Sequence, residues 1–552
     1  LVRVGVFRAD RPRQGDAHGA ESVRDQHRVR LFRLQIARDP HLVGADVAEH
    51  DVTRIEEALH VVQDALRLDR EALVVLLLGQ VVVDRRTQLR PVRDVEQRQT
   101  PLETPVELLV DLPERIREIG VDIQTTDFSV VGVGDMSGDV FGNGMLLSKH
   151  IRLVGAFNHM HIFFDPSPDA AKSWAERKRL FEMGRSSWED YDKRLISKGG
   201  GVFPRTMKRI PLSKPMQAIL ATDAKDMEPD QLIAAVLKAP VDLLWFGGIG
   251  TYVKAGHENN IEVGDRANDA LRVDGKDIRA KVIGEGANLG CTQAGRIEFA
   301  LRGGAINTDF IDNSAGVDCS DNEVNIKIAL AGARRAGRLS EERRIALLGE
   351  MTDEVAAIVL EDNRLQALAL SIAAAGGAEA MPAHLRVIDM LVARGELDRA
   401  NQGIAEDEEL CRRAGDGKGL TKPELAVLLS TTKLLLQDAI EQSALDEDPL
   451  LEPMLMEAFP GPVSGEFRTQ VLEHRLRNEL IATKLANRMI NRLGLTHPFE
   501  LTEQEGASLA HVAAAFACAD RLFGLTDIWA TLDSAKMPEA ARLALFDRLA
   551  LA

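Results

Sequence analysis

Cysteine and aromatic residues are scarce in this sequence. The 552 residues include four cysteines, scattered along the chain without a C-x-x-C pair, and aromatic residues make up 4%. Scattered cysteines provide neither a disulfide framework nor a zinc-binding pattern. The sequence therefore predicts no metal site and a location in a reducing cytoplasm.

Long apolar runs and an excess of positive charge are also absent. No apolar run reaches 18 residues, so we predict neither a transmembrane helix nor a signal peptide. The formal net charge of −17 argues against a nucleic-acid partner, because a nucleic-acid-binding face must neutralise phosphates. With 45% hydrophobic residues, the chain is long enough for about two to four domains with large cores. We expect a small-molecule substrate and a homo-oligomer, with no membrane partner.

Residues 1–115 use a restricted set of amino acids. Before residue 126 there is no Lys, Asn, Tyr, Trp, Cys or Met, whereas Arg, Val, Asp and Leu are abundant. Two interpretations remain open: an Arg-rich N-terminal domain, or translation of the wrong frame or strand of GC-rich DNA. We expect this segment to be irregular, and we assign no function to it.

The most informative stretch begins with a short β-branched run, Ser129 to Val131, which leads directly into a series of glycines. A helix-compatible stretch, 140–154, and a second apolar run, 161–165, follow. The pattern predicts a strand, a glycine turn, a helix and a second strand, as in dinucleotide-binding domains. Gly132 would allow the tight turn, and Gly134 would let the backbone approach a pyrophosphate at the helix N-terminus.

The spacing differs from the usual G-x-G-x-x-G. Ser137 stands where the third glycine would fall, and Gly138 comes one residue later. Asp165 would close the second strand, where a carboxylate can accept both hydroxyls of the adenosine ribose and repel a 2′-phosphate. The stretch therefore predicts a site that favours NAD over NADP.

Three further strands are predicted, and each ends in a loop rich in glycine or asparagine. They cover 241–246, 279–283 and 305–311. Because parallel strands present their carboxyl ends at one edge of a sheet, these loops indicate a ligand site there.

The predicted fold is α/β, with a Rossmann-like doubly wound parallel sheet in residues 116–330. Residues 331–552 form a mainly α-helical C-terminal region. Its expected helices cover 337–360, 383–399, 423–445 and 467–493.

Three separated motifs carry a family resemblance. Val121–Met145, Gly284–Leu289 and Asp312–Ser320 resemble segments of the large bacterial NAD-specific glutamate dehydrogenases. The similarity extends from about residue 116 to the C-terminus. It implies NAD as cofactor and oxidative deamination of L-glutamate to 2-oxoglutarate and ammonia.

The resemblance also implies roles for individual residues. Pyrophosphate and adenosine ribose would be held by Gly132, Gly134, Ser137, Gly138 and Asp165. Asn288 would lie beside the nicotinamide ribose, Asn313 near the nicotinamide or substrate, and Ser320 would donate to the distal carboxylate of the substrate. The structural alternatives are a helix N-cap for Ser320 and turn-forming asparagines for the other two.

The catalytic residues are not identified. The reaction needs a lysine of lowered pKa to activate water, and a carboxylate to move protons. The resemblance places both upstream of the cofactor domain, where this chain has no lysine before Lys149. Three hypotheses follow: a glutamate dehydrogenase, a non-catalytic NAD-binding fragment, or an assembly module built on the helical region.

Overall fold

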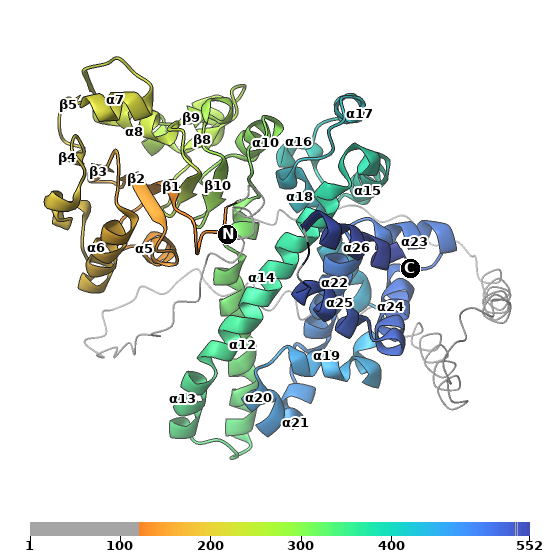
Figure 1. Cartoon of the computed structure of the whole chain (residues 1–552). Coiled ribbons are helices and arrows are strands. Elements are labelled where there is room, and N and C mark those ends of the chain that lie inside the picture. Colours follow the sequence, from red (N-terminus) through yellow and green to blue (C-terminus); the bar gives the residue numbers. More distant parts are fainter. Residues whose placement is uncertain (1–120, 536, 538, 552) are drawn as a thin grey trace, which may run out of the picture. The chain divides into compact units, whose positions relative to one another are not determined.

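The computed structural model describes residues 121–535, 537 and 539–551 (Figure 1). Both interpretations of residues 1–115 concern a segment outside these residues. In the described part, an α/β region is followed along the chain by a region built from helices alone.

One mixed sheet of six strands organises the α/β region of the described chain, in the order β10-β7-β1-β2-β3-β4. Its strands are β1 (Phe128–Val133), β2 (Ile151–Phe157), β3 (His161–Phe164), β4 (Gly201–Pro204), β7 (Leu243–Phe246) and β10 (Val282–Glu285). β10, β7, β1 and β2 are parallel, whereas β3 is antiparallel to both of its neighbours. Two short pairs lie outside this sheet: β5 (Ile210–Pro211) with β6 (Asp226–Met227), and β8 (Val253–Lys254) with β9 (Val273–Asp274).

Helices cover both faces of the sheet, because successive side chains of a strand point to opposite faces. Val130 packs in one core with α5 (Asp139–Leu146) and α6 (Ala170–Met183). Val131 packs in the other core with α7 (Lys214–Leu220) and α8 (Pro229–Leu237). Figure 1 shows the two helix pairs on opposite sides of the strands. The doubly wound α/β prediction is confirmed for the described residues.

Local sequence signals set several helix starts. Asp169 caps α6 by accepting from the backbone N–H of Lys172. At α8, Pro229 occupies the first turn, and Glu228 and Gln231 form a capping box. Proline at this position loses no helical hydrogen bond, so it suits the start of α8.

The prediction of one helix over 140–154 is wrong. α5 ends at Leu146, and Ile151–Phe157 forms β2. All but one residue of β2 are buried, so its sequence lacks the apolar–polar alternation of a half-exposed strand. A short strand covered on both faces cannot be distinguished from a buried helix by periodicity.

The strand predicted over 305–311 is also wrong. Only Ala305 forms an isolated bridge, to Val282, and the chain then turns into α11 (Asp309–Asp312). The strands predicted near 241–246 and 279–283 are confirmed in kind, the second starting three residues later than expected.

The remaining part of the described chain is helical, as predicted. Its main helices are α12 (Ser314–Arg335), α13 (Glu341–Glu350), α14 (Thr352–Ala375), α15 (Met381–Arg394), α17 (Asp407–Gly415), α18 (Lys422–Glu441), α19 (Glu452–Glu457), α20 (Gly461–Glu466), α21 (Arg468–Leu472), α22 (Arg477–Leu493), α23 (His497–Glu505), α24 (Leu509–Phe523), α25 (Leu525–Ser534) and α26 (Glu539–Leu551). α12 runs without a break across residue 330, where the sequence placed a domain boundary. That boundary stays a prediction.

Two predicted helices are each divided. The stretch 337–360 contains α13 and the start of α14, which are separated at Met351, the C-cap of the first and the N-cap of the second. The stretch 467–493 breaks between α21 and α22, where His474 Nδ1 accepts the backbone N–H of Leu476 at 3.1 Å. A side chain that takes a backbone donor replaces the helical bond at that point.

Candidate functional site at the carboxyl edge of the sheet

The chain leaves β1 toward β2 on one side and returns on the other side as β7. This reversal of strand order is the topological switch point, where ligands bind in open α/β sheets. Backbone hydrogen bonds tie the strand ends together there. Gly247 N donates to Val133 O at 2.9 Å, and Ala287 N donates to Phe246 O at 2.8 Å. The loops that follow β1, β7 and β10 therefore meet at one edge.

The glycines after β1 permit close packing of α5. A Cβ on Gly132 would lie 2.3 Å from the ring of Phe141, and one on Gly134 would lie 2.8 Å from Phe141 Cβ. Gly134 also has φ of +136°, and its carbonyl accepts from Trp188 Nε1 at 2.9 Å. Both glycines are thus required by the fold itself, whatever they bind.

Asp135 organises the turn that leads into α5. Its Oδ1 accepts from the Ser137 backbone N–H and hydroxyl at 3.0 and 2.7 Å, and from Gly138 N–H at 3.0 Å. Its Oδ2 accepts from Asn158 Nδ2 at 3.0 Å. The predicted cofactor residues Ser137 and Gly138 are held through a carboxylate that sequence reasoning did not select.

The prediction that Asp165 closes the second parallel strand is wrong. That strand is β2, and Asp165 follows the next strand, β3. It ends the antiparallel β3, where its N–H donates to Val154 O at 2.8 Å. Val154 precedes the last residue of β2, Phe157, by three positions, or about 10 Å along the strand. The residue that follows the carboxyl end of β2 is Asn158.

The carboxylate of Asp165 is also committed within the fold. The residue is 1% exposed, and its Oδ1 accepts from the backbone N–H groups of Ser167 and Ser197, each at 3.2 Å, and from the Ser197 hydroxyl. These bonds fasten the turn after β3 to the loop before β4.

A buried ion pair supports the loop after β10. Glu285 is fully buried and meets Arg296 through two bonds, Nε–Oε2 at 2.6 Å and NH2–Oε1 at 3.0 Å. Arg296 also reaches Asp309 at 3.0 Å, and Asp309 accepts the N–H of Leu289 at 2.8 Å. Burial lowers the pKa of Arg296, but the adjacent carboxylates outweigh it and hold that pKa above its usual value.

The structure brings together two of the predicted residues. Asn313 Nδ2 donates to Asn288 Oδ1, although 25 positions separate them. Asn288 follows β10, and Asn313 immediately precedes α12. The predicted nicotinamide-side pair is therefore a single hydrogen-bonded unit at this edge of the sheet.

Ser320 lies in the second turn of α12, so it is not the helix N-cap that was its structural alternative. Its hydroxyl donates to Gly316 O at 3.2 Å, and the residue is exposed. Asn313 and Ser320 are seven residues apart and so share one face of the helix. The exposed Val317 lies between them on that face.

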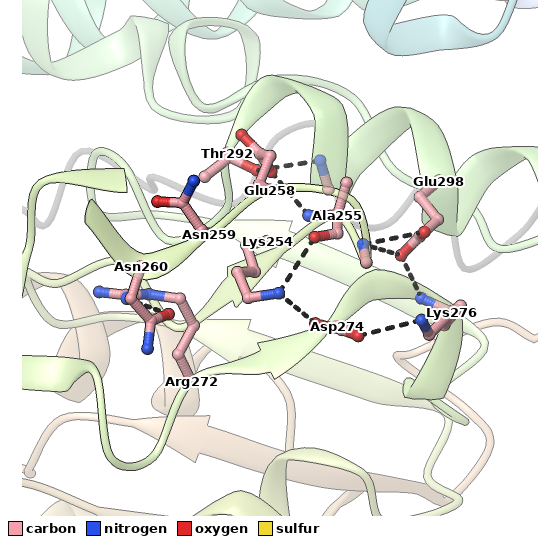
Figure 2. Close-up of polar contacts among 12 residues, drawn as sticks. Lys254, Ala255, Glu258, Asn259, Asn260, Arg272, Asp274, Lys276, Thr292 and Glu298 are labelled. Carbon is pink, nitrogen blue, oxygen red and sulfur yellow. Dashed lines mark hydrogen bonds and ion pairs between the residues drawn. The ribbon is translucent and has the colours of Figure 1, made fainter. Parts of the chain in front are cut away.

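A polar network fixes the segment beside the loop after β7 (Figure 2). Lys254 Nζ pairs with Asp274 at 2.6 Å and donates to Ala255 O at 3.2 Å. Glu298 accepts the backbone N–H groups of Gly256 and Lys276. Because Lys254 is held by these partners, we assign it a structural role.

The described residues contain neither a metal-binding group of side chains nor a single membrane-spanning helix. No group of three or more His, Cys, Asp or Glu side chains in that part of the chain is arranged to hold a metal ion. No single described helix is long and apolar enough to cross a membrane. α24 and α25 together would pass by length and composition, but they are bent by 72° relative to each other.

Sequence reasoning missed Asp135, Asn158 and the Glu285–Arg296 pair. A glutamate at the end of a buried strand was a usable signal, because a buried carboxylate needs a partner. The identity of that partner, eleven residues later, depends on how α10 (Gln293–Leu301) returns to the strand. The roles of Gly132, Gly134, Ser137, Gly138, Asp165, Asn288, Asn313 and Ser320 in binding stay predictions.

Comparison with known proteins agrees with the motifs at this edge. Residues 111–373 match the family model described as bacterial NAD-glutamate dehydrogenase, catalytic domain, and residues 417–550 match glutamate dehydrogenase, C-terminal. The NAD-specific glutamate dehydrogenase of Mycobacterium tuberculosis is 49% identical over 441 residues, which are 79% of this chain and 27% of that protein.

Two other relatives carry the same name. The protein of Pseudomonas aeruginosa is 48% identical over 80% of this chain and 27% of its own length, and that of Halomonas elongata 47% identical over 76% and 26%. The chain thus spans about a quarter of the length of these curated relatives. Over its two matched ranges, the chain belongs to the bacterial NAD-glutamate dehydrogenase family.

Proposed function

We propose that this chain supplies the NAD-binding part of a glutamate dehydrogenase, which deaminates L-glutamate oxidatively to 2-oxoglutarate and ammonia. The proposal is carried by one observation: the loops after β7 and β10 are hydrogen-bonded to the last residues of β1 and β7, so the three strand ends meet at the switch point of the sheet. The names of the relatives support the choice of NAD and glutamate. Cytoplasmic location and homo-oligomeric assembly stay predictions from the sequence.

The residues at this edge fit a dinucleotide. The start of α5 would face the pyrophosphate, since the first N–H groups of a helix have no partner within it, and the turn from Gly134 to Gly138 would bring the chain to that helix. Asn288 and Asn313 would orient the nicotinamide end, and Ser320 would donate to the distal carboxylate of glutamate. NAD, when bound, would accept the hydride from the substrate Cα.

Proton transfer requires groups that the residues assigned to the nicotinamide and substrate end do not supply. Asn288, Asn313 and Ser320 have neutral side chains, and none of them can serve as a strong base near neutral pH. We therefore assign the activation of water and the movement of protons to the remaining three quarters of the enzyme represented by the relatives. In this proposal the chain holds the cofactor and orients the substrate.

Calorimetry and a turnover assay on the 552-residue chain test the proposal. We expect NAD to bind with a measurable heat, and glutamate-dependent NADH formation to stay at background. Adding the missing part of a relative in trans should restore NADH formation. The double variant Asn288→Ala/Asn313→Ala serves as the matched control and should bind NAD more weakly. Absence of NAD binding by the folded parent chain would refute the proposal, and rapid turnover by the chain alone would refute the division of roles.

A further inference from the structure

The two candidate carboxylates for cofactor selection occupy different places in the sheet. Asp135 follows β1 at the carboxyl edge, whereas Asp165 lies beside the interior of β2. Resting on the proposed function, we propose that Asp135 selects NAD against NADP by placing a negative charge beside the 2′ position of the adenosine ribose. Arg205, which donates to the backbone carbonyl of Asn158, favours NADP instead.

The position of Asp135 suits this role. In dinucleotide-binding sheets, the adenosine ribose lies by the carboxyl end of the strand reached through the first crossover, and here that strand is β2. Asp135 is bonded to Asn158, the residue directly after β2, at 3.0 Å. Its carboxylate thus bridges the ends of β1 and β2, between which the ribose would lie.

The carboxylate of Asp135 has one oxygen with spare capacity. Oδ1 already accepts three hydrogen bonds from Ser137 and Gly138. Oδ2 accepts one, from Asn158, and a carboxylate oxygen can accept about two. Because the residue is partly exposed, Oδ2 can receive a ribose hydroxyl, and a 2′-phosphate at the same place would meet a like charge.

Asn158 cannot make this selection itself. Its Oδ1 accepts the backbone N–H groups of Met160 and His161, both at 2.8 Å, and its Nδ2 donates to Asp135. Both ends of the amide are therefore used, and the side chain is neutral. Asn158 positions Asp135 and exerts no repulsion on a phosphate.

Arg205 brings positive charge to the same edge. Its NH1 donates to the carbonyl of Asn158 at 3.3 Å, and its NH2 pairs with Asp230 at 3.0 Å. A guanidinium close to the ribose position is what NADP-binding sites use to accept the 2′-phosphate. The negative charge of Asp135 opposes this attraction. When the charge of Asp135 is removed, the attraction between Arg205 and the 2′-phosphate should therefore no longer be opposed.

Dissociation constants for NAD and NADP, measured by calorimetry on the full chain, test the inference. Asp135→Asn keeps the shape and an acceptor for the turn but removes the charge, and it should lower the NADP-to-NAD ratio of dissociation constants about tenfold or more. Asp165→Asn, the matched control, should leave the ratio within about twofold of the parent. The double variant Asp135→Asn/Arg205→Gln should regain the weak NADP binding of the parent.

The possible results distinguish a failure of this inference from a failure of the proposed function. A purely structural role for Asp135 would weaken both cofactors equally and leave the ratio unchanged, which would overturn the inference while NAD binding by the parent still upholds the proposed function. A ratio that responds to Asp165→Asn would also overturn it. If Asp135→Asn fails to fold, Arg205→Gln alone decides: weaker NADP binding with unchanged NAD binding supports the inference, and no change overturns it. A parent chain that binds neither cofactor refutes the proposed function and this inference together.

Discussion

The side-chain amide of Asn313 donates to the side-chain oxygen of Asn288, joining the start of α12 to the loop after β10. Each residue came from a different sequence motif, and only the folded chain places them in contact. The pair links the loop after β10 to the first long helix of the C-terminal region.

Breaking the hydrogen bond between Asn288 and Asn313 should weaken NAD binding, and the effects of the two substitutions should not be additive. Asn288→Ala and Asn313→Ala should each reduce NAD affinity, and the double variant should lose less than the sum. The coupling should be about 0.5–1.5 kcal/mol, as for one hydrogen bond. Calorimetry on the four chains measures it, with Asn401→Ala on exposed α16 (Arg399–Gln402) as the control. Strict additivity would show that the two asparagines act independently.

Adding a methyl group at Gly134 should destabilise the protein. The new Cβ would collide with Phe141, and the backbone would be held at φ of +136°. We expect Gly134→Ala to cost roughly 2–5 kcal/mol in the free energy of unfolding, combining backbone strain with overpacking.

Gly303 provides the control for that substitution. It has φ of +92°, and nothing lies within 4 Å of its added Cβ, so Gly303→Ala should show the backbone strain alone. Urea denaturation measures both variants. Equal losses of stability would mean that the contact with Phe141 is unimportant.

Asp533 should stabilise the helical region through two arginines. It accepts from Arg492 at 2.7 Å and from Arg364 at 3.1 Å, and its side chain is 16% exposed. Asp533→Asn should cost about 2–4 kcal/mol in the free energy of unfolding, because Arg492 would remain buried without a carboxylate. Asp416→Asn, which breaks the exposed pair with Arg412, should leave the stability unchanged.

The carboxylate of Asp533 also makes the free energy of unfolding depend on pH in a defined direction. Burial raises the pKa of Asp533, but the bonds from both arginines outweigh it and lower the pKa below 3.8. Its stabilising contribution is therefore present above the unfolded pKa and is lost as the pH falls through the lower folded pKa. Acid denaturation of Asp533→Asn should lack this loss. An acid transition identical to that of the parent would contradict it.

His384 should make the protein less stable in mild acid. The residue is 3% exposed, and burial lowers its pKa from 6.5 to about 4. Between these values the unfolded chain binds the proton and the folded chain does not, so stability is lost as the pH falls below 6.5.

Replacing His384 should remove this loss of stability in mild acid. From pH 7.5 to pH 5, the parent should lose about 2 kcal/mol more than His384→Leu in the free energy of unfolding. Urea denaturation at both pH values measures the difference, and His511→Leu, at an exposed position, is the control. A parallel decline of parent and His384→Leu would show that His384 is protonated in the folded protein.

The sequence by itself determined the kind of fold, and it predicted which loops form the candidate site. A β-branched run that leads into glycines predicted β1, because this signal acts within a few residues. The motifs at 284–289 and 312–320 indicated a ligand edge, and Asn288 and Asn313 do meet there.

Only the tertiary structure decided which residues flank the predicted ribose position. β2 is covered on both faces, so its sequence resembled the end of a helix, and the strand count was one too low. That error moved the expected carboxylate from the end of β2 to Asp165, on an antiparallel strand. Asp135 and Asn158 lie 23 positions apart, and their contact exists because β1 and β2 end side by side. Local patterns encode turns and helix caps, but strand pairing over such distances depends on how the whole sheet packs.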